Sequence, residues 1–246
     1  MSARLEELLQ KAHRMLVFTG AGISTGSGIP DFRGPQGIWK TRQPVYYDEF
    51  LASEDKRVEY WEYKCAYYDM FQGARPNAAH KAIAELERLG RVQAVVTQNI
   101  DGLHQAAGSS EGSVVEVHGT NRFVECVNCD TRLEPAPIVA WFREHKACPR
   151  CACGGFLKSA TISFGQPLRP DVLERAFREA ARADLVLALG STLSVHPAAS
   201  IPLVAVRAGA PYVIINQGDT DHDRLATLRL EGDVASLLPP AVSALT

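Results

Sequence analysis

The sequence has no strong excess of charge of either sign. Its 246 residues include 26 lysines and arginines and 28 aspartates and glutamates, so the formal net charge is −2. Proteins that bind nucleic acid through the phosphate backbone usually carry a large basic surface. The composition therefore argues against bulk nucleic-acid binding, and we expect no direct nucleic-acid partner.

Long apolar runs are also missing. A transmembrane helix needs about 20 consecutive apolar residues, and no stretch of the sequence reaches that length. The first residues include Glu6 and Glu7 and lack the apolar core of a signal peptide. We therefore expect a cytoplasmic protein with no membrane partner, and we expect a monomer.

What is present is the composition of an ordinary globular protein. Hydrophobic residues make up 46% of the chain and charged residues 22%, both typical of a soluble domain. A chain of 246 residues can bury a sizeable core as one large domain or as one domain with a small insert.

Residues 20–33, GAGISTGSGIPDFR, follow a short apolar segment at 15–19 that predicts a buried strand. A strand followed by closely spaced glycines and hydroxyls is typical of a pyrophosphate site. The glycines let backbone N–H groups approach the phosphates, and a helix N-terminus adds favourable charge. The third glycine comes one place later than in the dehydrogenase motif. By itself the motif is therefore equally compatible with a turn that binds no ligand.

Further strands alternate with helical patterns along the chain. The sequence predicts them at residues 92–97, 114–117, 160–165, 185–189 and 212–215. Among the predicted helices are one capped by Asn77 and running to about residue 89, and one at 171–183. This alternation predicts an α/β fold with a doubly wound parallel sheet. Ligand-type residues follow at least four strands, at the edge where such sheets bind ligands.

Six cysteines are present, and five of them lie between residues 126 and 153. Cys126 and Cys129 form one C-x2-C pair, and Cys148 and Cys151 form a second, with Cys153 two residues further on. Such pairs are typical of a structural zinc ion held by four thiolates. Because four thiolates leave no open coordination position, we expect the zinc to hold structure rather than to activate water.

Together these motifs resemble those of the sirtuins, a family of NAD-dependent protein-lysine deacylases. The resemblance covers essentially the whole chain, and the motifs occur in the family's order. It rests on the paired cysteines and on residues 20–24, 30–33, 97–104, 118–119, 164–165, 190–195 and 215–216.

The resemblance implies a single catalytic domain, residues 1–246, with a Rossmann-type large part and a small zinc-binding part. The small part would combine an aromatic-rich helical segment with the zinc module. Aromatic residues at this density more often form a packed layer than a cofactor site. NAD and an acyl-lysine peptide would meet between the parts. The approximate boundaries are 1–35, 75–122 and 160–246 for the large part, and 36–74 and 123–159 for the small part.

The resemblance also implies an NAD site made of residues that follow the predicted strands. They are Gly20, Ala21, Gly22 and Ser24 at the pyrophosphate; Asp31, Phe32 and Arg33 in a flexible cofactor loop; Gln98 at the adjoining ribose; Asn99, Ile100 and Asp101 around the nicotinamide; and Gly190, Ser191, Thr192, Asn216, Gln217 and Asp233 at the adenosine end.

A catalytic set and a peptide groove are implied as well. His118 would be the general base, and Asn99 and Asp101 would bind the nicotinamide carboxamide. The ordinary pKa of histidine, about 6.5, suits proton uptake near neutral pH. The residues implied for the substrate groove are Ile162, Phe164, Gly165 and Val195.

The implied reaction is NAD-dependent removal of acetyl groups from lysine side chains of acetylated proteins or peptides, which releases nicotinamide and O-acetyl-ADP-ribose. NAD and one structural Zn²⁺ would be the cofactors. Mono-ADP-ribosyl transfer, which begins with the same nicotinamide cleavage, is the nearest alternative. A dehydrogenase fits less well, because no second strand ends in an acidic residue about 20 positions after the glycines.

Three positions depart from the family pattern. Gln166 stands where the family usually has a glutamate, which changes the charge beside the peptide groove. The second zinc pair has two readings: alignment on the downstream motif pairs Cys148 with Cys153, whereas local spacing favours Cys148 with Cys151. Residues 60–64 lack the Tyr-x-x-Arg pair of members that prefer acidic acyl groups, which favours acetyl or other uncharged groups.

Overall fold

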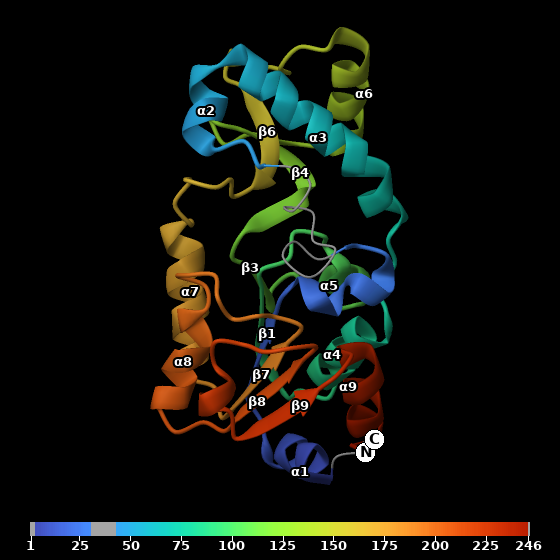
Figure 1. Ribbon diagram of the computed structural model, residues 1–246, viewed down its shortest axis with the longest axis vertical. Coiled ribbons are helices and arrows are strands. Elements are labelled where there is room, and N and C mark those ends of the chain that lie inside the picture. The colour runs from blue at the N-terminus through green and yellow to red at the C-terminus, as the bar shows by residue number, and fades with distance from the viewer. Residues whose placement is uncertain (1–2, 31–42, 246) are drawn as a thin grey trace.

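The computed structural model describes residues 3–30 and 43–245. In this part of the chain the strands form two sheets, and the helices pack around them (Figure 1). All neighbouring strands of the larger sheet are parallel. In spatial order they are β3 (Val114–Glu116), β2 (Val92–Thr97), β1 (Met15–Thr19), β7 (Leu185–Leu189), β8 (Tyr212–Asn216) and β9 (Leu228–Glu231).

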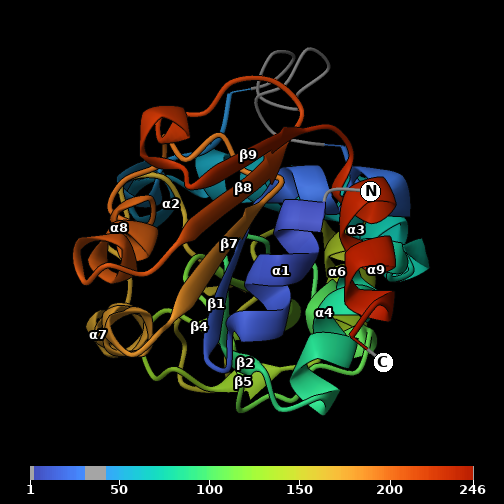
Figure 2. The same cartoon turned by 90° about the horizontal axis from the view of Figure 1, so that it is seen from below.

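Helices cover both faces of this sheet (Figure 2). Every residue of β1, β7 and β8 is buried, as expected for central parallel strands. One face packs against α1 (Ala3–Lys11), α4 (Ala78–Arg88) and α9 (Val234–Ser243), and the other against α7 (Pro170–Ala181) and α8 (Ser200–Arg207). The predicted doubly wound α/β fold is therefore confirmed.

The smaller sheet is antiparallel and lies at the top of Figure 1. In spatial order its strands are β5 (Arg132–Leu133), β4 (Gly119–Cys126) and β6 (Leu157–Thr161). The helices of this smaller part are α2 (Tyr47–Ala52), α3 (Glu54–Gly73) and α6 (Pro135–His145).

Aromatic side chains form the core of the smaller part. Phe50, Tyr60, Trp61 and Phe142 are buried in one cluster. Trp61 stacks on Phe142 with 6.1 Å between ring centroids, and its indole N–H donates to the carbonyl of Leu157 at 3.0 Å. The prediction that the aromatic-rich segment is a packed helical layer is confirmed.

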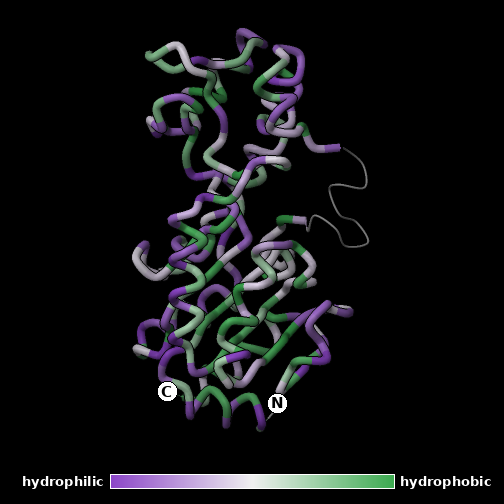
Figure 3. The backbone as a smooth tube through the Cα atoms, turned by 90° about the vertical axis from the view of Figure 1, so that its left-hand side faces the viewer, coloured by the Kyte–Doolittle hydropathy of each residue, from purple (hydrophilic) through white to green (hydrophobic). Residues whose placement is uncertain are grey.

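Hydrophobic segments gather inside the larger part, and hydrophilic ones lie mainly on its outer turns (Figure 3). Helices α1 and α9, which hold the two ends of the described chain, lie at the end of the larger part remote from the smaller sheet. No helix in the described ranges is long and apolar enough to cross a membrane.

Several local features differ from the sequence prediction. The strand predicted at 160–165 is β6, which begins at Leu157 because it pairs with β4 from that point. After β1 the chain forms two short 3₁₀ turns, Ala21–Ile23 and Thr25–Ser27, where the phosphate motif predicts a helix N-terminus. Helix α6, strand β9 and helix α9 are additions to the predicted elements. The residue boundaries of the two parts stay a prediction.

The turns that follow β1 and β7 lie side by side, because these strands are neighbours at the centre of the sheet. The amides of Gly20 and Gly22 donate to the carbonyls of Leu189 and Gly190 at 3.1 and 2.8 Å. A Cβ on Gly20 would lie 2.8 Å from the Gly190 oxygen, and one on Gly22 would lie 2.9 Å from it. These glycines therefore allow two backbone turns to touch.

Gly190 is the most constrained of these glycines. Its φ is 61°, and a Cβ would clash with the Ile23 amide and lie 2.6 Å from the Gly22 carbonyl carbon. We expect Gly190→Ala to lower the free energy of unfolding by about 2–5 kcal/mol, from left-handed backbone strain plus overpacking. Gly209→Ala is the matched control, because Gly209 has a φ of 92° and open space around it.

The control should lose only the backbone strain, about 1–2 kcal/mol. Urea denaturation of the wild type and both variants measures the difference. Equal losses of unfolding free energy in the two variants would show that a methyl group at Gly190 causes no overpacking between the turns, which would contradict the prediction.

Candidate functional site

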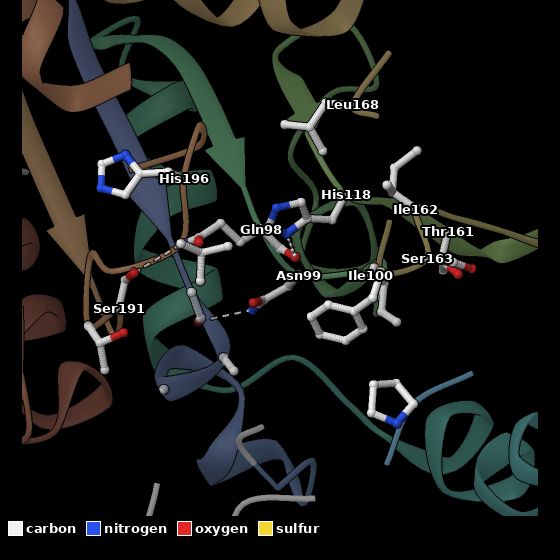
Figure 4. Close-up of a pocket in the computed structure, with 18 of the residues that line it drawn as sticks. Gln98, Asn99, Ile100, His118, Thr161, Ile162, Ser163, Leu168, Ser191 and His196 are labelled. Atoms are coloured by element: carbon white, nitrogen blue, oxygen red, sulfur yellow. Dashed lines mark hydrogen bonds between the residues drawn. The ribbon is translucent and has the colours of Figure 1, made fainter. Parts of the chain in front are cut away.

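A cleft of about 830 Å³ opens at the carboxyl edge of the larger sheet (Figure 4). Turns after β1, β2, β3, β7 and β8 line one side, and residues 43–45, side chains of α3 and residues 161–168 line the other. Most residues predicted for the site meet here, namely Gly20, Ala21, Gly22, Gln98, Asn99, Ile100, His118, Ile162, Phe164, Gly165, Gly190, Ser191, Thr192, Val195, Asn216, Gln217 and Asp233.

Two of the described residues predicted for the site are not among those that line the cleft. Ser24 and Asp101 lie behind its described wall, where they bind each other. Asp31, Phe32 and Arg33, predicted as a cofactor loop, lie outside the described residues.

The turn after β1 uses most of its own amides. Besides the bonds made by Gly20 and Gly22, Ile23 N donates to Gly20 O at 3.1 Å and Ser24 N donates to Ala21 O at 3.0 Å. Among residues 20–24, the amide of Ala21 makes none of these bonds, and Ala21 lines the cleft. The glycines of this motif thus allow the two turns to pack closely, and Ala21 is the residue whose amide would contact a phosphate.

Gln98 connects the turns that follow β1, β2 and β7. Its Nε2 donates to Ser191 Oγ at 2.9 Å, and its backbone amide donates to Thr19 O at 3.0 Å. Figure 4 shows this contact across the floor of the cleft. Gln98, which is predicted at the ribose, is therefore hydrogen-bonded to Ser191, which is predicted at the adenosine end.

The far end of the cleft is shaped by two side chains that also hold their own loops. Asp233 caps α9: Oδ1 accepts from Ala235 N at 3.2 Å and Oδ2 from Ser236 Oγ at 2.9 Å. Asn216 is only 6% exposed, and its Nδ2 donates to Gln217 O at 3.1 Å. Both side chains fix the backbone that would face an adenosine.

His118 stands between β3 and β4, where the two sheets meet. Its carbonyl accepts from Ile162 N at 2.8 Å, and its Nδ1 lies 3.1 Å from Gln98 O. Since a carbonyl oxygen can only accept, Nδ1 carries a proton, and Nε2 is the basic nitrogen of the neutral ring. Gly119 follows with a φ of 73°, and a Cβ there would clash with Ala160 O. Glycine thus lets β4 pass β6 directly after the histidine.

Residues 163–166 form a tight turn at the rim of the cleft. Gln166 N donates to Ser163 O at 3.0 Å, and Gln166 Oε1 accepts from Ser163 N at 3.1 Å. Gly165 has a φ of 78°, which this turn requires. Phe164 is 38% exposed, with its ring centroid 6.0 Å from that of Tyr46. Gln166 therefore holds the turn that presents two predicted groove residues.

Four thiols of the smaller part converge on one point. The sulfur atoms of Cys126, Cys129, Cys151 and Cys153 all lie within 4.8 Å of one another. The distance is 3.5 Å for Cys126–Cys153 and 3.8 Å for Cys129–Cys151. A tetrahedral zinc with Zn–S bonds of about 2.3 Å needs sulfurs about 3.8 Å apart, so the cluster fits one zinc ion. A disulfide, at about 2.05 Å, does not fit these distances.

Cys148 is not part of this cluster, and both pairings predicted for it are wrong. Its thiol is buried in the aromatic core and lies 3.5 Å from Pro149 O. Burial raises the pKa of the Cys148 thiol to about 11, whereas a zinc ligand must be a thiolate. Cys151 and Cys153 form the second pair instead, on a turn closed by the bond from Cys151 N to Gly155 O at 2.8 Å.

Comparison with known proteins decides the family. Residues 20–197 match the sequence profile of the Sir2 family. The chain is also 43% identical over 240 residues to the NAD-dependent protein deacetylase of Rhodopseudomonas palustris, a match that covers 97% of this chain and 95% of that protein. The chain belongs to the Sir2 family. The resemblance to sirtuins is thereby confirmed.

Other sirtuins are similar over nearly their whole length. The NAD-dependent protein deacetylase of Sulfolobus acidocaldarius is 40% identical over 244 residues, covering 98% of this chain and 93% of that one. A solved structure of Sir2 with a p53 peptide and NAD⁺ is 36% identical, with a TM-score of 0.88 over 99% of this chain and 98% of that chain.

A second solved structure is a histidine-to-alanine Sir2 variant with a deacetylated p53 peptide and 3′-O-acetyl-ADP-ribose. It is 37% identical, with a TM-score of 0.89, and covers 98% of this chain and 97% of that chain.

Behind the cleft of this sirtuin lies a buried polar network that sequence analysis did not predict as a unit. Ser24, 1% exposed, donates to Asp101 Oδ2 at 2.7 Å and accepts from Asn99 Nδ2 at 3.2 Å. His80 Nε2 lies 3.5 Å from Ser24 Oγ. Burial raises the pKa of Asp101. The predicted nicotinamide residue Asn99 is thus fixed from behind.

A second branch of the network reaches Asn99 through its backbone. His104 Nε2 lies 2.9 Å from Thr19 Oγ1, which donates to Thr97 Oγ1 at 2.8 Å. Thr97 Oγ1 in turn accepts from Asn99 N at 3.0 Å. The ring centroids of His104 and His80 lie 5.1 Å apart.

Both imidazoles are neutral near pH 7. Burial lowers the pKa of His80 to about 4, and burial together with the neighbouring His80 lowers the pKa of His104 to about 3. The one local signal for His80 is its place in the first turn of the helix capped by Asn77. His104 ends the motif at 97–104, but no role was predicted for it. The cleft-lining residues Lys64 and His196 were also missed.

Removing one cysteine of the cluster should remove the zinc. We expect one zinc ion per chain in the purified protein and its loss in Cys153→Ser, because three thiolates no longer close the tetrahedron. Cys148→Ala is the matched control and should keep the metal. Metal analysis by mass spectrometry measures both. Zinc lost from the Cys148 variant and kept in the Cys153 variant would contradict the assignment.

Stability should fall as the pH drops from about 6.5 to about 4. In the unfolded chain an imidazole binds a proton near pH 6.5, whereas His104 stays neutral down to about pH 3 in the folded chain. The unfolded state therefore binds more protons in this window, and stability declines by up to about 1.4 kcal/mol per pH unit for each such imidazole. The raised pKa of Asp101 acts in the opposite direction.

His104→Gln should flatten this decline, and His145→Gln, which changes an exposed ring on α6, should leave it unchanged. Urea denaturation at a series of pH values provides the test. An unaltered decline in the His104 variant would show that its imidazole does not stay neutral.

Proposed function

We propose that this sirtuin removes acetyl groups from lysine side chains of proteins and peptides, in a reaction that consumes NAD and releases nicotinamide and O-acetyl-ADP-ribose. The observation that carries the proposal is the position of His118. Gln98, on the nucleotide side of the cleft, binds its ring, and Ile162, on the peptide side, binds its carbonyl. The names of the two deacetylases and the contents of the two solved structures support it.

The described cleft suits NAD in its position and in its chemistry. The turns after β1 and β7 meet at the switch point where parallel sheets bind dinucleotides. Ala21 N would face the pyrophosphate and Gln98 the ribose, while Asn216 and Asp233 would lie along the adenosine end. When bound, NAD supplies a ribose carbon that becomes strongly electrophilic as nicotinamide leaves.

Asn99 and Ile100 would surround the nicotinamide. The Asn99 amide is held by Gly20 O at 3.1 Å and by Ser24 Oγ at 3.2 Å. Asp101 receives the Ser24 hydroxyl, so its contribution in this conformation runs through Ser24 to Asn99. A side chain fixed in this way pays little entropy when it binds a ligand.

His118 would act as the general base. Its Nε2 would take up the proton of a ribose hydroxyl. Nδ1 would keep its own proton and continue to donate it in the hydrogen bond to Gln98 O. The carbonyl also stabilises the imidazolium that forms, because its lone pair faces the positive ring. The acetyl-lysine would enter along Ile162 and the turn at 163–166, with Val195 on the opposite wall.

We also propose that the enzyme works as a monomer in the cytoplasm, with acetylated proteins as its partners. The four-thiol cluster suits a reducing compartment, where cysteines serve as metal ligands rather than forming disulfides. The zinc would hold the smaller part together and take no part in the reaction.

Mass spectrometry of an acetyl-lysine peptide, incubated with and without NAD, tests the proposal. We expect NAD-dependent loss of the acetyl group with formation of O-acetyl-ADP-ribose. His118→Ala should lower kcat/KM by about 100- to 10,000-fold, the usual contribution of a general base. His145→Ala, remote from the cleft, should have no effect.

An intact peptide together with ADP-ribose attached to protein would contradict deacetylation and indicate mono-ADP-ribosyl transfer. Peptide and NAD that both stay unchanged would contradict the proposal as well.

A further inference from the structure

Lys64 lines the cleft without an acidic partner among the described residues. It projects from α3, and its Nζ donates to Asn121 Oδ1 at 3.1 Å and to Thr161 Oγ1 at 3.3 Å. Both partners are neutral oxygens. The reaction proposed above gives this amine no task.

The amine lies near the proposed reaction centre. Asn121 N donates to the carbonyl of Ile100 at 2.8 Å, and Thr161 precedes the residue whose amide donates to the carbonyl of His118. The segments that bind Lys64, at Asn121 and at 161–162, therefore also bind the carbonyls of Ile100 and His118. An acyl group whose carbonyl lies beside His118 would extend along this wall toward Lys64.

A second positive charge, that of Lys158, acts on Lys64 and would favour an anion bound at this wall. The ring of Tyr60 lies between two amines, with its centroid 5.6 Å from Lys64 Nζ and 5.8 Å from Lys158 Nζ. Lys158 donates to the backbone carbonyls of Ser159 and Thr161, and Glu125 is the carboxylate that acts on its charge. Glu59, which lines the same wall, is bonded to Lys56 at 2.9 Å. The carboxylate of Glu59, an acidic side chain among the described residues that line this cleft, is therefore already paired.

An amine in this setting is costly for the empty protein. Burial, together with the charge of Lys158, lowers the pKa of Lys64 to about 7. A methionine of similar length would fill the space without desolvating a charge. A carboxylate brought to this point would supply the missing counter-charge and form a charge-assisted hydrogen bond.

We propose that Lys64 binds the terminal carboxylate of a dicarboxylic acyl group, such as succinyl or glutaryl, so that this sirtuin removes acidic acyl groups from lysine in addition to acetyl. The inference rests on the proposed function, because the reaction is the same. The acyl group leaves the lysine nitrogen and is transferred to ADP-ribose, nicotinamide is released, and Lys64 is unchanged. Lys64 is thus a specificity-determining residue.

This assignment departs from the expectation of uncharged acyl groups drawn from residues 60–64. That expectation depends on the absence of a Tyr-x-x-Arg pair. The structure provides a single lysine at this wall, with its cation held by Asn121 and Thr161.

Rates of deacylation of one peptide carrying different acyl groups test the inference. The series is acetyl, succinyl, and the neutral amide of the succinyl group, which has the same shape without the charge. We expect the wild type to cleave the succinyl peptide at least 10-fold more efficiently than its amide, since a hydrogen bond to a charged group is worth about 10- to 100-fold.

Variants of Lys64 locate the effect. Lys64→Gln keeps a donor for Asn121 and Thr161 but removes the charge, and it should lose the preference for succinyl over its amide through a higher KM for the succinyl peptide. Lys64→Arg should retain the preference. Lys11→Gln, which changes an exposed lysine on α1 that is paired with Glu7, is the matched control and should behave like the wild type.

Each other outcome is decisive. A wild type that cleaves acetyl but neither succinyl nor glutaryl overturns the inference and leaves the proposed function intact. A succinyl preference that survives in Lys64→Gln also overturns it. Failure to cleave the acetyl peptide with NAD overturns the proposed function itself. If the variants do not fold, the comparison of succinyl with its amide in the wild type still decides.

Discussion

The backbone contact between the turns after β1 and β7 positions both halves of the cleft. Gly22 N donates to Gly190 O at 2.8 Å, and neither turn has room for a Cβ at this contact. With the turns held together, Gln98 can reach Ser191, and Asn99 can donate to Gly20 O. The close packing expected of a protein interior thus extends to the edge of the sheet, where a ligand binds.

Neutral groups behind the cleft keep its geometry without placing charge there. Burial keeps His80 and His104 uncharged at neutral pH, so they can act as fixed hydrogen-bonding partners for Ser24 and Thr19. Both branches end on Asn99. The imidazole of His118, the proposed general base, lies apart from them near the smaller sheet.

Features set by local physics follow from the sequence, and features set by distant contacts do not. Strands β1 and β7 occupy their predicted residues, because each is a short run of buried and mostly apolar residues that needs cover on both faces. Helix α4 begins after Asn77 as its cap predicts. The prediction that Cys148 binds zinc was wrong for a different reason. The spacing of cysteines cannot reveal that an aromatic core buries one of the thiols. Lys64 likewise becomes conspicuous only when β4 and β6 pack beside it.

Following the acetyl oxygen tests the central claim most directly. A peptide whose acetyl-lysine carries a heavy oxygen isotope in the carbonyl would be incubated with NAD, and the products would be weighed. The account predicts one nicotinamide released for each lysine freed, with the heavy oxygen found in O-acetyl-ADP-ribose. Heavy oxygen in free acetate, with NAD intact, would show that the cleft hydrolyses the amide without coupling to NAD and would contradict the account.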